Sequence, residues 1–288
     1  MGVKVENISY RYPGSEEGAM AFGITDVSFE AETGSTIGII GHTGSGKSTL
    51  VQHLNGLYLP QKGRIIIGDT VIDKDSKNLR DLRRRVGLVF QYPEDQLFEE
   101  SVFLDIAFGP KNMGLSGEAL EEAVNRAMTD MELDLELRKR SPYELSGGQK
   151  RKVAIATVLS MEPEILILDE PTAGLDPKSK EDLLKLLFRM KEKRNLTVFF
   201  VSHNMDDIFR FCDRVLVMNY GKVVMDGTPR DIYSQGEALS RLGLGVPFTM
   251  EVQKLLHSQG LYKGPMEPMT LEALAGIMAE EAKGRAHA

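Results

Sequence analysis

The spacing of hydrophobic and polar positions changes several times along the chain, and these changes predict strands that alternate with helices. Residues 3–8 and 24–29 alternate apolar and polar side chains as half-buried strands do, with a turn at Pro13-Gly14-Ser15 between them. Short uninterrupted apolar runs have the length of strands buried on both faces. We predict such strands at residues 36–40, 86–91, 165–168 and 197–201.

The remaining patterns place two hairpins and four helices around those strands. Residues 64–72 are strand-like with a turn at Gly68-Asp69, and residues 214–226 form a second predicted hairpin with its turn at Tyr220-Gly221. Apolar side chains at helical spacing predict helices at residues 47–57, 119–135, 150–159 and 178–192. Strands that alternate with helices in this way indicate a parallel sheet with helical crossovers, so the predicted fold class is α/β.

Two segments depart from this alternation. Residues of about 92–145 are acidic, rich in Leu, Ala and Met, and helical in spacing, which predicts a small helical subdomain inserted into the core. Residues 230–288 contain short helical patterns broken by Gly and Pro. We therefore expect a main domain over residues 1–229 and a C-terminal helical extension over residues 230–288.

Composition and charge narrow the functional classes. The 288 residues are 42% hydrophobic and 27% charged, which is ordinary for a globular protein. No apolar run approaches the roughly 18–20 residues of a membrane span, and the first residues lack a signal-peptide pattern. The single cysteine, Cys212, excludes an internal disulfide and a cysteine-based zinc cluster. We expect a soluble cytosolic chain, and the net charge of −7 counts against nucleic acid as its main partner.

The segment Gly41-His42-Thr43-Gly44-Ser45-Gly46-Lys47-Ser48 matches the phosphate-binding pattern G-x-x-x-x-G-K-[ST]. Its glycines allow a tight loop whose N–H groups point toward phosphate, Lys47 reaches the β- and γ-phosphates, and the Ser48 hydroxyl ligates Mg²⁺. Thr49 follows at the start of the predicted helix and is a further expected nucleotide contact. An ordinary Gly-rich turn is the alternative, but the loop lies between a predicted strand and a predicted helix, as the pattern requires.

A second candidate group is a pair of acids at the end of an apolar strand. Ile165-Leu166-Ile167-Leu168 leads directly into Asp169 and Glu170. Asp169 is expected to hold Mg²⁺, and Glu170 is expected to act as the general base toward the attacking water. Adjacent acids at a strand end are common by themselves, and the phosphate loop is what favours the functional interpretation.

The third pattern is Leu145-Ser146-Gly147-Gly148-Gln149, which precedes the predicted helix at residues 150–159. A helix start capped by Ser146 is the simplest interpretation. The same exposed N–H groups and hydroxyl also suit phosphate binding at a helix N-terminus.

With these three patterns in this order, residues 3–229 resemble the ATP-binding cassette (ABC) family. The resemblance implies a RecA-like parallel-sheet core, an N-terminal antiparallel β-subdomain and the inserted helical subdomain. It also implies that ATP is the substrate, and that the signature pentapeptide of one subunit contacts the γ-phosphate held by the phosphate loop of another. A second ABC ATPase subunit, identical or related, is thus an expected partner.

Further positions match this family residue by residue. Gln91 resembles the glutamine that senses Mg²⁺ and the water, and His203 resembles the histidine that hydrogen-bonds the γ-phosphate. Gly174-Leu175-Asp176 resembles the loop that crosses the dimer interface, so Asp176 is an expected nucleotide-side residue. Tyr12 lies where the family has an aromatic residue that stacks on adenine, with Tyr10 as an alternative. Each of these side chains alone would be ordinary.

Narrower features are similar to the energy-coupling factor branch of importers, which takes up vitamins and cobalt or nickel ions. They are Gly41-His42-Thr43, residues 90–98 and Gly174-Leu175-Asp176-Pro177. The resemblance implies a membrane-embedded coupling subunit and a substrate-binding membrane subunit as partners, with this chain peripheral on the cytoplasmic face of the membrane. The C-terminal extension is expected to pack against the core or a partner ATPase.

A cluster of five acids after Gln91 is a candidate docking surface for basic helices of a membrane partner, or else an ordinary solvated face. Its members are Glu94, Asp95, Glu99, Glu100 and Asp105. An ATPase subunit of another ABC transporter type is an alternative to the importer subunit of this branch, and two further functions are less favoured. A soluble ABC ATPase acting on DNA or the ribosome usually carries a long coiled coil, zinc modules or a second cassette, and a non-hydrolysing regulator is disfavoured by Lys47, Asp169 and Glu170.

Overall fold

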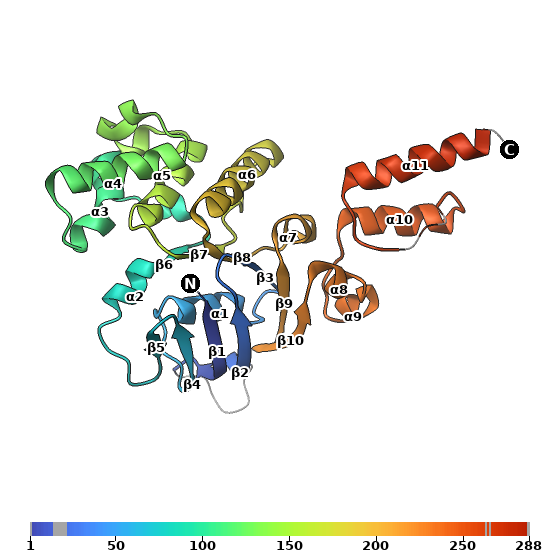
Figure 1. The fold of residues 1–288 in the computed structure, drawn as a ribbon, viewed down its shortest axis with the longest axis horizontal. Coiled ribbons are helices and arrows are strands. Elements are labelled where there is room, and N and C mark those ends of the chain that lie inside the picture. Colours follow the sequence, from blue (N-terminus) through green and yellow to red (C-terminus); the bar gives the residue numbers. More distant parts are fainter. Residues whose placement is uncertain (1, 14–21, 263, 265, 287–288) are drawn as a thin grey trace.

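The computed structural model describes residues 2–13, 22–262, 264 and 266–286, and Figure 1 shows how their elements are arranged. Gly14 and Ser15 of the first predicted turn lie outside the described residues. Two sheets form the centre of the molecule, a helical group lies beyond one edge of the larger sheet, and the C-terminal helices extend away from the other.

The larger sheet has six strands in the order β10-β9-β3-β8-β7-β6, and the pairs from β9 to β6 are parallel. β10 pairs antiparallel with β9 as the predicted hairpin. The parallel strands are buried along their whole length, apart from the first and last residues of β9, and they coincide with the uninterrupted apolar runs. Their bounds are β3 Thr36–Ile40, β6 Val86–Val89, β7 Ile165–Asp169, β8 Thr197–Val201, β9 Arg214–Asn219 and β10 Lys222–Gly227.

The smaller sheet is antiparallel, in the order β2-β1-β4-β5, and it confirms the predicted β-subdomain. Its apolar face shares one core with the larger sheet and with α1, Lys47–Leu54. Phe29 of β2 lies edge-on to Phe199 of β8, with 6.0 Å between the ring centroids, and so joins the two sheets. The bounds are β1 Val3–Arg11, β2 Phe22–Ala31, β4 Lys62–Ile67 and β5 Thr70–Ile72.

The inserted segment folds into a helical group, as predicted. In α4 the buried residues Ala123, Val124, Ala127 and Met128 form one apolar face, which packs into a shared core with α3 and α5. The Ser160 hydroxyl donates to the Ile106 carbonyl at 2.9 Å, so this packing continues to the end of α5, beyond residue 145. The elements are η1 Pro93–Gln96, α3 Val102–Asn112, α4 Gly117–Asp130, η2 Leu135–Lys139, η3 Pro142–Glu144 and α5 Gly147–Leu159.

Among the described residues, three further helices, α2, α6 and α7, belong to the main domain, and four form the C-terminal extension. Phe248 N–H donates to the Asp206 carboxylate at 3.1 Å, which ties the start of α10 to α7. α10 and α11 lie beside each other and project away from the sheets (Figure 1). The elements are α2 Arg80–Arg85, α6 Pro177–Arg194, α7 Met205–Phe211, α8 Pro229–Tyr233, α9 Gly236–Arg241, α10 Phe248–Ser258 and α11 Leu271–Ala286. Among the described residues, none of the helices has both the length and the apolar character of a membrane span.

Several predicted boundaries were wrong by a few residues, each for a local reason. The helix after the phosphate loop ends at Leu54 rather than residue 57, because Gly56 has a φ of +70°. The predicted strand at residues 86–91 ends at Val89, so Gln91 follows the strand instead of ending it. The helix predicted to reach residue 135 ends at Asp130, and Glu132 just beyond it has a φ of +50°.

Candidate active site

The phosphate loop connects β3 to α1, and two of its glycines, Gly41 and Gly46, fit spaces that no side chain can occupy. A Cβ atom on Gly41 would lie 2.4 Å from the Met218 carbonyl oxygen and from the Ser45 Oγ. Gly46 has a φ of +103°, a conformation that glycine adopts readily. The loop therefore turns tightly at the carboxyl end of β3 and opens onto the N-terminus of α1, which is a favourable position for an anion.

Lys47 lies over this loop and is only 6% exposed. Its Nζ donates to the carbonyl oxygens of Gly41 at 2.8 Å and His42 at 3.1 Å. Burial lowers the pKa of Lys47, while the nearby Glu170 and Asp169 oppose that shift. A desolvated ammonium held at the mouth of the loop interacts strongly with phosphate.

Asp169 is the last residue of β7 and lies beside the phosphate loop. Burial raises the pKa of its carboxyl, and a hydrogen bond from the Ser48 side chain acts in the opposite direction. The hydroxyl and the carboxylate thus present two adjacent oxygen atoms, the ligand type that Mg²⁺ prefers. Among the described residues, no three His, Cys, Asp or Glu side chains form a cluster that would hold a metal alone. Mg²⁺ commonly takes one or two protein ligands plus water and phosphate, so the residues fit this ion.

Glu170 is held between two of the predicted residues. The His203 Nε2 lies 2.8 Å from Glu170 Oε1, and the Gln91 Nε2 donates to Glu170 Oε2 at 3.3 Å. The backbone of Glu170 has a φ of +50°, which is strained for a residue with a side chain. Glu170 therefore lies just beyond the carboxyl end of β7, where His203 and Gln91 contact its carboxylate.

Tyr12 and Tyr10 lie beside α1, the helix that follows the loop. The Tyr12 hydroxyl and the Thr49 hydroxyl are 2.9 Å apart, and the Tyr12 residue is 36% exposed. Tyr10 is partly buried and stacks on Tyr58, with 5.1 Å between the ring centroids and 24° between the planes. Tyr12 is therefore the more accessible of the two rings next to the phosphate-loop helix.

The signature pentapeptide is built as an exposed helix start. Ser146 Oγ accepts from the Gln149 N–H at 3.3 Å, and Gln149 Oε1 accepts from the Ser146 N–H at 3.0 Å, a reciprocal cap on α5. Ser146, Gly147 and Gly148 are exposed. Figure 1 shows α5 within the helical group, separated from α1 and the phosphate loop. The structure thus brings Gln91, Asp169, Glu170 and His203 to the loop, but it leaves the signature outside that cluster.

Asp176 caps another helix. Its Oδ1 accepts from the N–H groups of Lys178 and Ser179, each at 3.1 Å, at the start of α6. A hydrogen bond from the Ser179 side chain, together with these N–H groups, lowers the pKa of the Asp176 carboxyl. The carboxylate therefore fixes the end of the loop that follows Glu170, and it is exposed as an interface residue would be.

Sequence reasoning missed that the β9–β10 turn supports the phosphate loop. Gly221 N–H donates to the Ser45 carbonyl at 2.9 Å, and the His42 Nε2 lies 2.9 Å from Asn219 Oδ1. The His42 ring also lies edge-on to Tyr220, at 5.2 Å between centroids. The hairpin itself was predicted, but its contact joins residues about 180 positions apart, and no local pattern encodes such a pairing.

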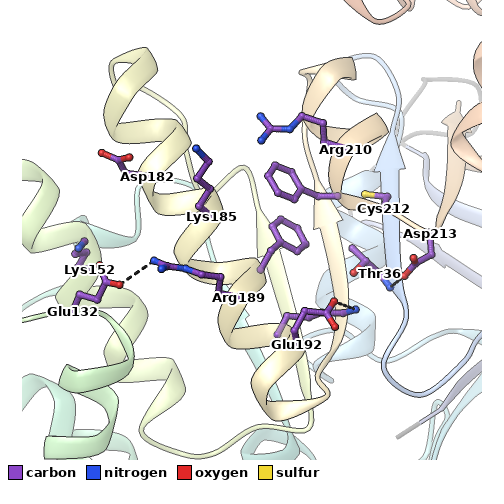
Figure 2. A pocket seen from close by; sticks show the side chains of 13 residues that line it. Thr36, Glu132, Lys152, Asp182, Lys185, Arg189, Glu192, Arg210, Cys212 and Asp213 are labelled. Atoms are coloured by element: carbon purple, nitrogen blue, oxygen red, sulfur yellow. Dashed lines mark hydrogen bonds and ion pairs between the residues drawn. The ribbon is translucent and has the colours of Figure 1, made fainter. Parts of the chain in front are cut away.

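A separate cavity of about 690 Å³ lies between α6 and α7, and Figure 2 shows the side chains that line it. Among the described residues, its lining contains none of the predicted nucleotide residues. Arg189 pairs with Glu132 (Figure 2), Lys191 pairs with Glu192, and the rings of Phe188 and Phe211 stack on each other. The cavity is thus distinct from the candidate active site.

A phosphate loop, a carboxylate beside its serine and a second carboxylate held by Gln91 and His203 together define a P-loop ATPase. The sequence profile of the ABC transporter family matches residues 24–173. The chain belongs to this family, and the prediction drawn from its three motifs is confirmed.

Individual relatives show which members of this family the chain is similar to. The chain is 49% identical over 273 residues to the energy-coupling factor transporter ATP-binding protein EcfA2 of Caldanaerobacter subterraneus subsp. tengcongensis, covering 94% of each chain. It is 48% identical over 261 residues to the EcfA2 protein of Clostridium tetani, covering 90% of each.

Solved structures agree on the fold. The structure of cbiO1 from Clostridium perfringens, part of the ABC transporter complex cbiONQ, has a TM-score of 0.74 and 34% identity, covering 90% of this chain and 98% of cbiO1. A dimeric post-hydrolysis structure of the ATP-binding cassette MJ0796, bound to ADP and phosphate, has a TM-score of 0.70 and 28% identity, covering 79% of this chain and 99% of MJ0796. The predicted class of ATPase and its resemblance to the energy-coupling factor branch are therefore confirmed.

Proposed function

We propose that the chain is the ATP-hydrolysing motor subunit of an energy-coupling factor importer, which powers uptake of a vitamin or a transition-metal ion through membrane partners. The observation that carries this proposal is the convergence of Gln91 and His203 on the Glu170 carboxylate, beside an intact phosphate loop. A regulatory protein without ATPase activity has no use for a carboxylate held in this way.

The hydrolytic step assigns one role to each side chain. A water oxygen attacks the γ-phosphorus of ATP, the bond from that phosphorus to the β–γ bridging oxygen breaks, and the proton of the water passes to a Glu170 carboxylate oxygen. Lys47 neutralises charge on the β- and γ-phosphates as the bond breaks. His203 and Gln91 hold Glu170 in the orientation that accepts the proton, since each contacts a different oxygen of the carboxylate.

The metal expected at this site is Mg²⁺, held by the Ser48 hydroxyl and the Asp169 carboxylate. When bound, it supplies positive charge to the phosphate oxygens. The buried position of Asp169 and its hydrogen bond with Ser48 support this assignment. Tyr12 is proposed to stack on the adenine, because it is exposed beside Thr49 at the first turn of α1.

A second subunit is required because the phosphate loop and the signature of one chain lie apart. Ser146, Gly147 and Gly148 are exposed at the start of α5, so they are available to the γ-phosphate bound by a facing ATPase. Asp176 is exposed at the start of α6 and is proposed to lie at the same interface. The dimeric cassettes among similar solved structures support this arrangement.

The acidic docking surface requires a correction. Glu94 pairs with Arg151, and the buried Asp105 accepts the N–H groups of Phe98 and Glu99 at 3.2 Å each, so both are structural side chains. Asp95 and Glu100 are exposed and Glu99 is half-buried. We propose that these three acids contact the membrane coupling subunit, with the chain peripheral on the cytoplasmic face.

Purification of the tagged full-length chain from its native membrane tests the assembly. We expect an ATPase partner, a coupling subunit and a substrate-binding membrane subunit to co-purify, and the specific ATPase rate to rise with the concentration of the ATPase pair. A chain that hydrolyses ATP at full rate as a monomer, at every concentration and without companions, would contradict the proposal.

A further inference from the structure

Arg151 is a buried cation that the hydrolytic scheme does not use. It belongs to α5, follows Ser146 of the signature by five residues, and is only 2% exposed. A guanidinium remains charged at any physiological pH, and its burial is costly unless it is paired and hydrogen-bonded. The contacts of its three nitrogen atoms therefore indicate what the residue holds together.

On one side, Arg151 binds the segment that follows Gln91. Its Nε donates to Glu94 Oε2 at 2.8 Å, and its Nη2 donates to Glu94 Oε1, which makes a two-point ion pair. The guanidinium carbon also lies 5.8 Å from the centroid of the Tyr92 ring. Arg151 thus fixes both the carboxylate of η1 and the aromatic residue before it.

On the other side, Arg151 binds the turn that follows Glu170. Its Nη1 donates to the carbonyl oxygens of Pro171 at 3.1 Å and Ala173 at 2.7 Å. The Ala173 N–H in turn donates to the Glu170 carbonyl at 3.1 Å, so these carbonyls and the Glu170 backbone form one tight turn. Displacement of the guanidinium would therefore displace the backbone that carries the Glu170 carboxylate.

The segment after Gln91 and the turn after Glu170 also contact each other directly. A Cβ atom on Gly174 would lie 3.3 Å from Cε1 of Tyr92, so the Tyr92 ring packs against the loop that leads to Asp176. Three segments meet at one guanidinium: the signature helix, the segment with the proposed docking acids, and the turn of the catalytic carboxylate. The first two belong to the helical group or lead into it, whereas the third belongs to the parallel-sheet core.

We propose that Arg151 is a positioning residue that sets the Glu170 carboxylate according to the position of the docking segment and the signature helix. It is not a catalytic residue, because its hydrogen bonds run to Glu94 and to backbone carbonyls. The inference rests on the proposed role of Glu170 as the base. A shift of η1 by a docked partner would move Glu94, Arg151 and the turn at residues 171–173 together.

The test uses the full-length chain in complex with its ATPase partner and membrane subunits. Arg151→Met is expected to lower kcat by about 10- to 100-fold, because a small misplacement of a catalytic group has effects of this size, while KM changes by less than about twofold. Arg151→Lys keeps the charge with fewer donors and should recover part of kcat. Arg138→Met is the matched control, since Arg138 also pairs with a glutamate and lies 4.8 Å from an aromatic ring, but it has no bond to the catalytic turn.

A double variant separates positioning from folding. Arg151→Met leaves Glu94 without its cation and is expected to lower the melting temperature, whereas Arg151→Met combined with Glu94→Gln removes both charges and should restore it. Positioning predicts that kcat stays low in the double variant, because the Pro171 and Ala173 carbonyls are still unbound. Recovery of kcat together with the melting temperature would overturn the proposal.

A parallel Glu170→Gln variant separates the two levels of inference. Loss of turnover in Glu170→Gln together with wild-type kcat in Arg151→Met would overturn the positioning role alone. Wild-type turnover in Glu170→Gln would instead remove the base on which that role depends, and would overturn both proposals.

Discussion

His203 Nε2 lies 2.8 Å from Glu170 Oε1, and the register of two neighbouring parallel strands produces this contact. Asp169 of β7 is paired with Val201 of β8, so the residues just beyond each strand emerge at the same edge of the sheet. A carboxylate only accepts hydrogen bonds, so Nε2 is the donor. The histidine therefore orients the proposed base through a ring whose own position is set by β8.

Replacement of His203 by Gln is expected to lower kcat by roughly 10- to 100-fold, a range typical for loss of a group that orients a catalytic base. KM for ATP should change much less, because the phosphate loop is untouched. Steady-state ATPase measurements at saturating and limiting ATP would separate the two constants. His257→Gln is the control, since that histidine is exposed on α10. A variant with unchanged kcat would exclude this role for His203.

Glu170→Gln preserves the size of the side chain and removes its ability to accept the proton. We expect the variant to bind ATP, to hydrolyse it at least about 100-fold more slowly, and to accumulate as a nucleotide-bound dimer. Size-exclusion chromatography with bound-nucleotide analysis would detect that dimer. Glu162→Gln, a change at an exposed glutamate paired with Arg126, is the control. Turnover at the wild-type rate would rule out Glu170 as the base.

Lys47→Ala removes the ammonium that lies over the phosphate loop. The loop loses the two hydrogen bonds that Lys47 donates to its carbonyls, but the hydrogen bond from the Gly221 N–H to the Ser45 carbonyl remains. We therefore expect the chain to stay folded while the affinity for ATP falls by at least about tenfold. Titration with a fluorescent ATP analogue would measure the affinity, with circular dichroism as a check on folding. Lys111→Ala, at an exposed position on α3, should leave the affinity unchanged. Unchanged affinity in Lys47→Ala would contradict the phosphate-loop assignment.

The sequence predicted the residues proposed to contact the nucleotide better than the residues that hold them in position. The uninterrupted apolar runs and the local Gly-rich pattern each specify an element and its ends, so Lys47, Asp169 and Glu170 were predicted together. The pairing of Arg151 with Glu94 depends on how α5 packs against η1, and a lone arginine after the signature gives no local signal of burial. For the same reason Glu94 and Asp105 were misassigned to a solvated docking surface, although the chain itself uses both.

Glu99 and Glu100 are two of the three acids that we propose contact the membrane coupling subunit. Glu99 is half-buried and Glu100 is exposed. Reversal of both charges to Lys is expected to weaken assembly with the membrane subunits and to leave the ATPase activity of the isolated ATPase pair within about twofold of wild type. Co-purification yield and its dependence on salt concentration would measure the effect. Glu118→Lys with Glu122→Lys, a matched pair of exposed changes on α4, is the control. Intact assembly after reversal at Glu99 and Glu100 would argue against this surface.

The buried His53 of α1 is expected to make the free energy of unfolding depend on pH. It is fully buried in α1, its Nδ1 donates to the Thr49 carbonyl at 2.7 Å, and its ring packs against Tyr10 and Tyr58. Its Nε2 is buried without a hydrogen-bond partner among the described residues. Burial lowers the pKa of His53 below its ordinary value, so the folded protein favours the neutral ring.

The lowered pKa of His53 decides whether the free energy of unfolding rises or falls with pH. Below the unfolded-state pKa of about 6.5, the unfolded chain binds a proton that the folded chain does not, so the free energy of unfolding falls as pH decreases toward the folded-state pKa. We expect the melting temperature of wild type to fall between about pH 7.5 and pH 5.5 more steeply than that of His53→Asn, which cannot titrate. The raised pKa of Asp105 acts in the opposite direction, but it is present in both proteins and cancels in the comparison. Equal slopes in the two proteins would show that His53 is already protonated in the fold, or that its titration does not affect unfolding.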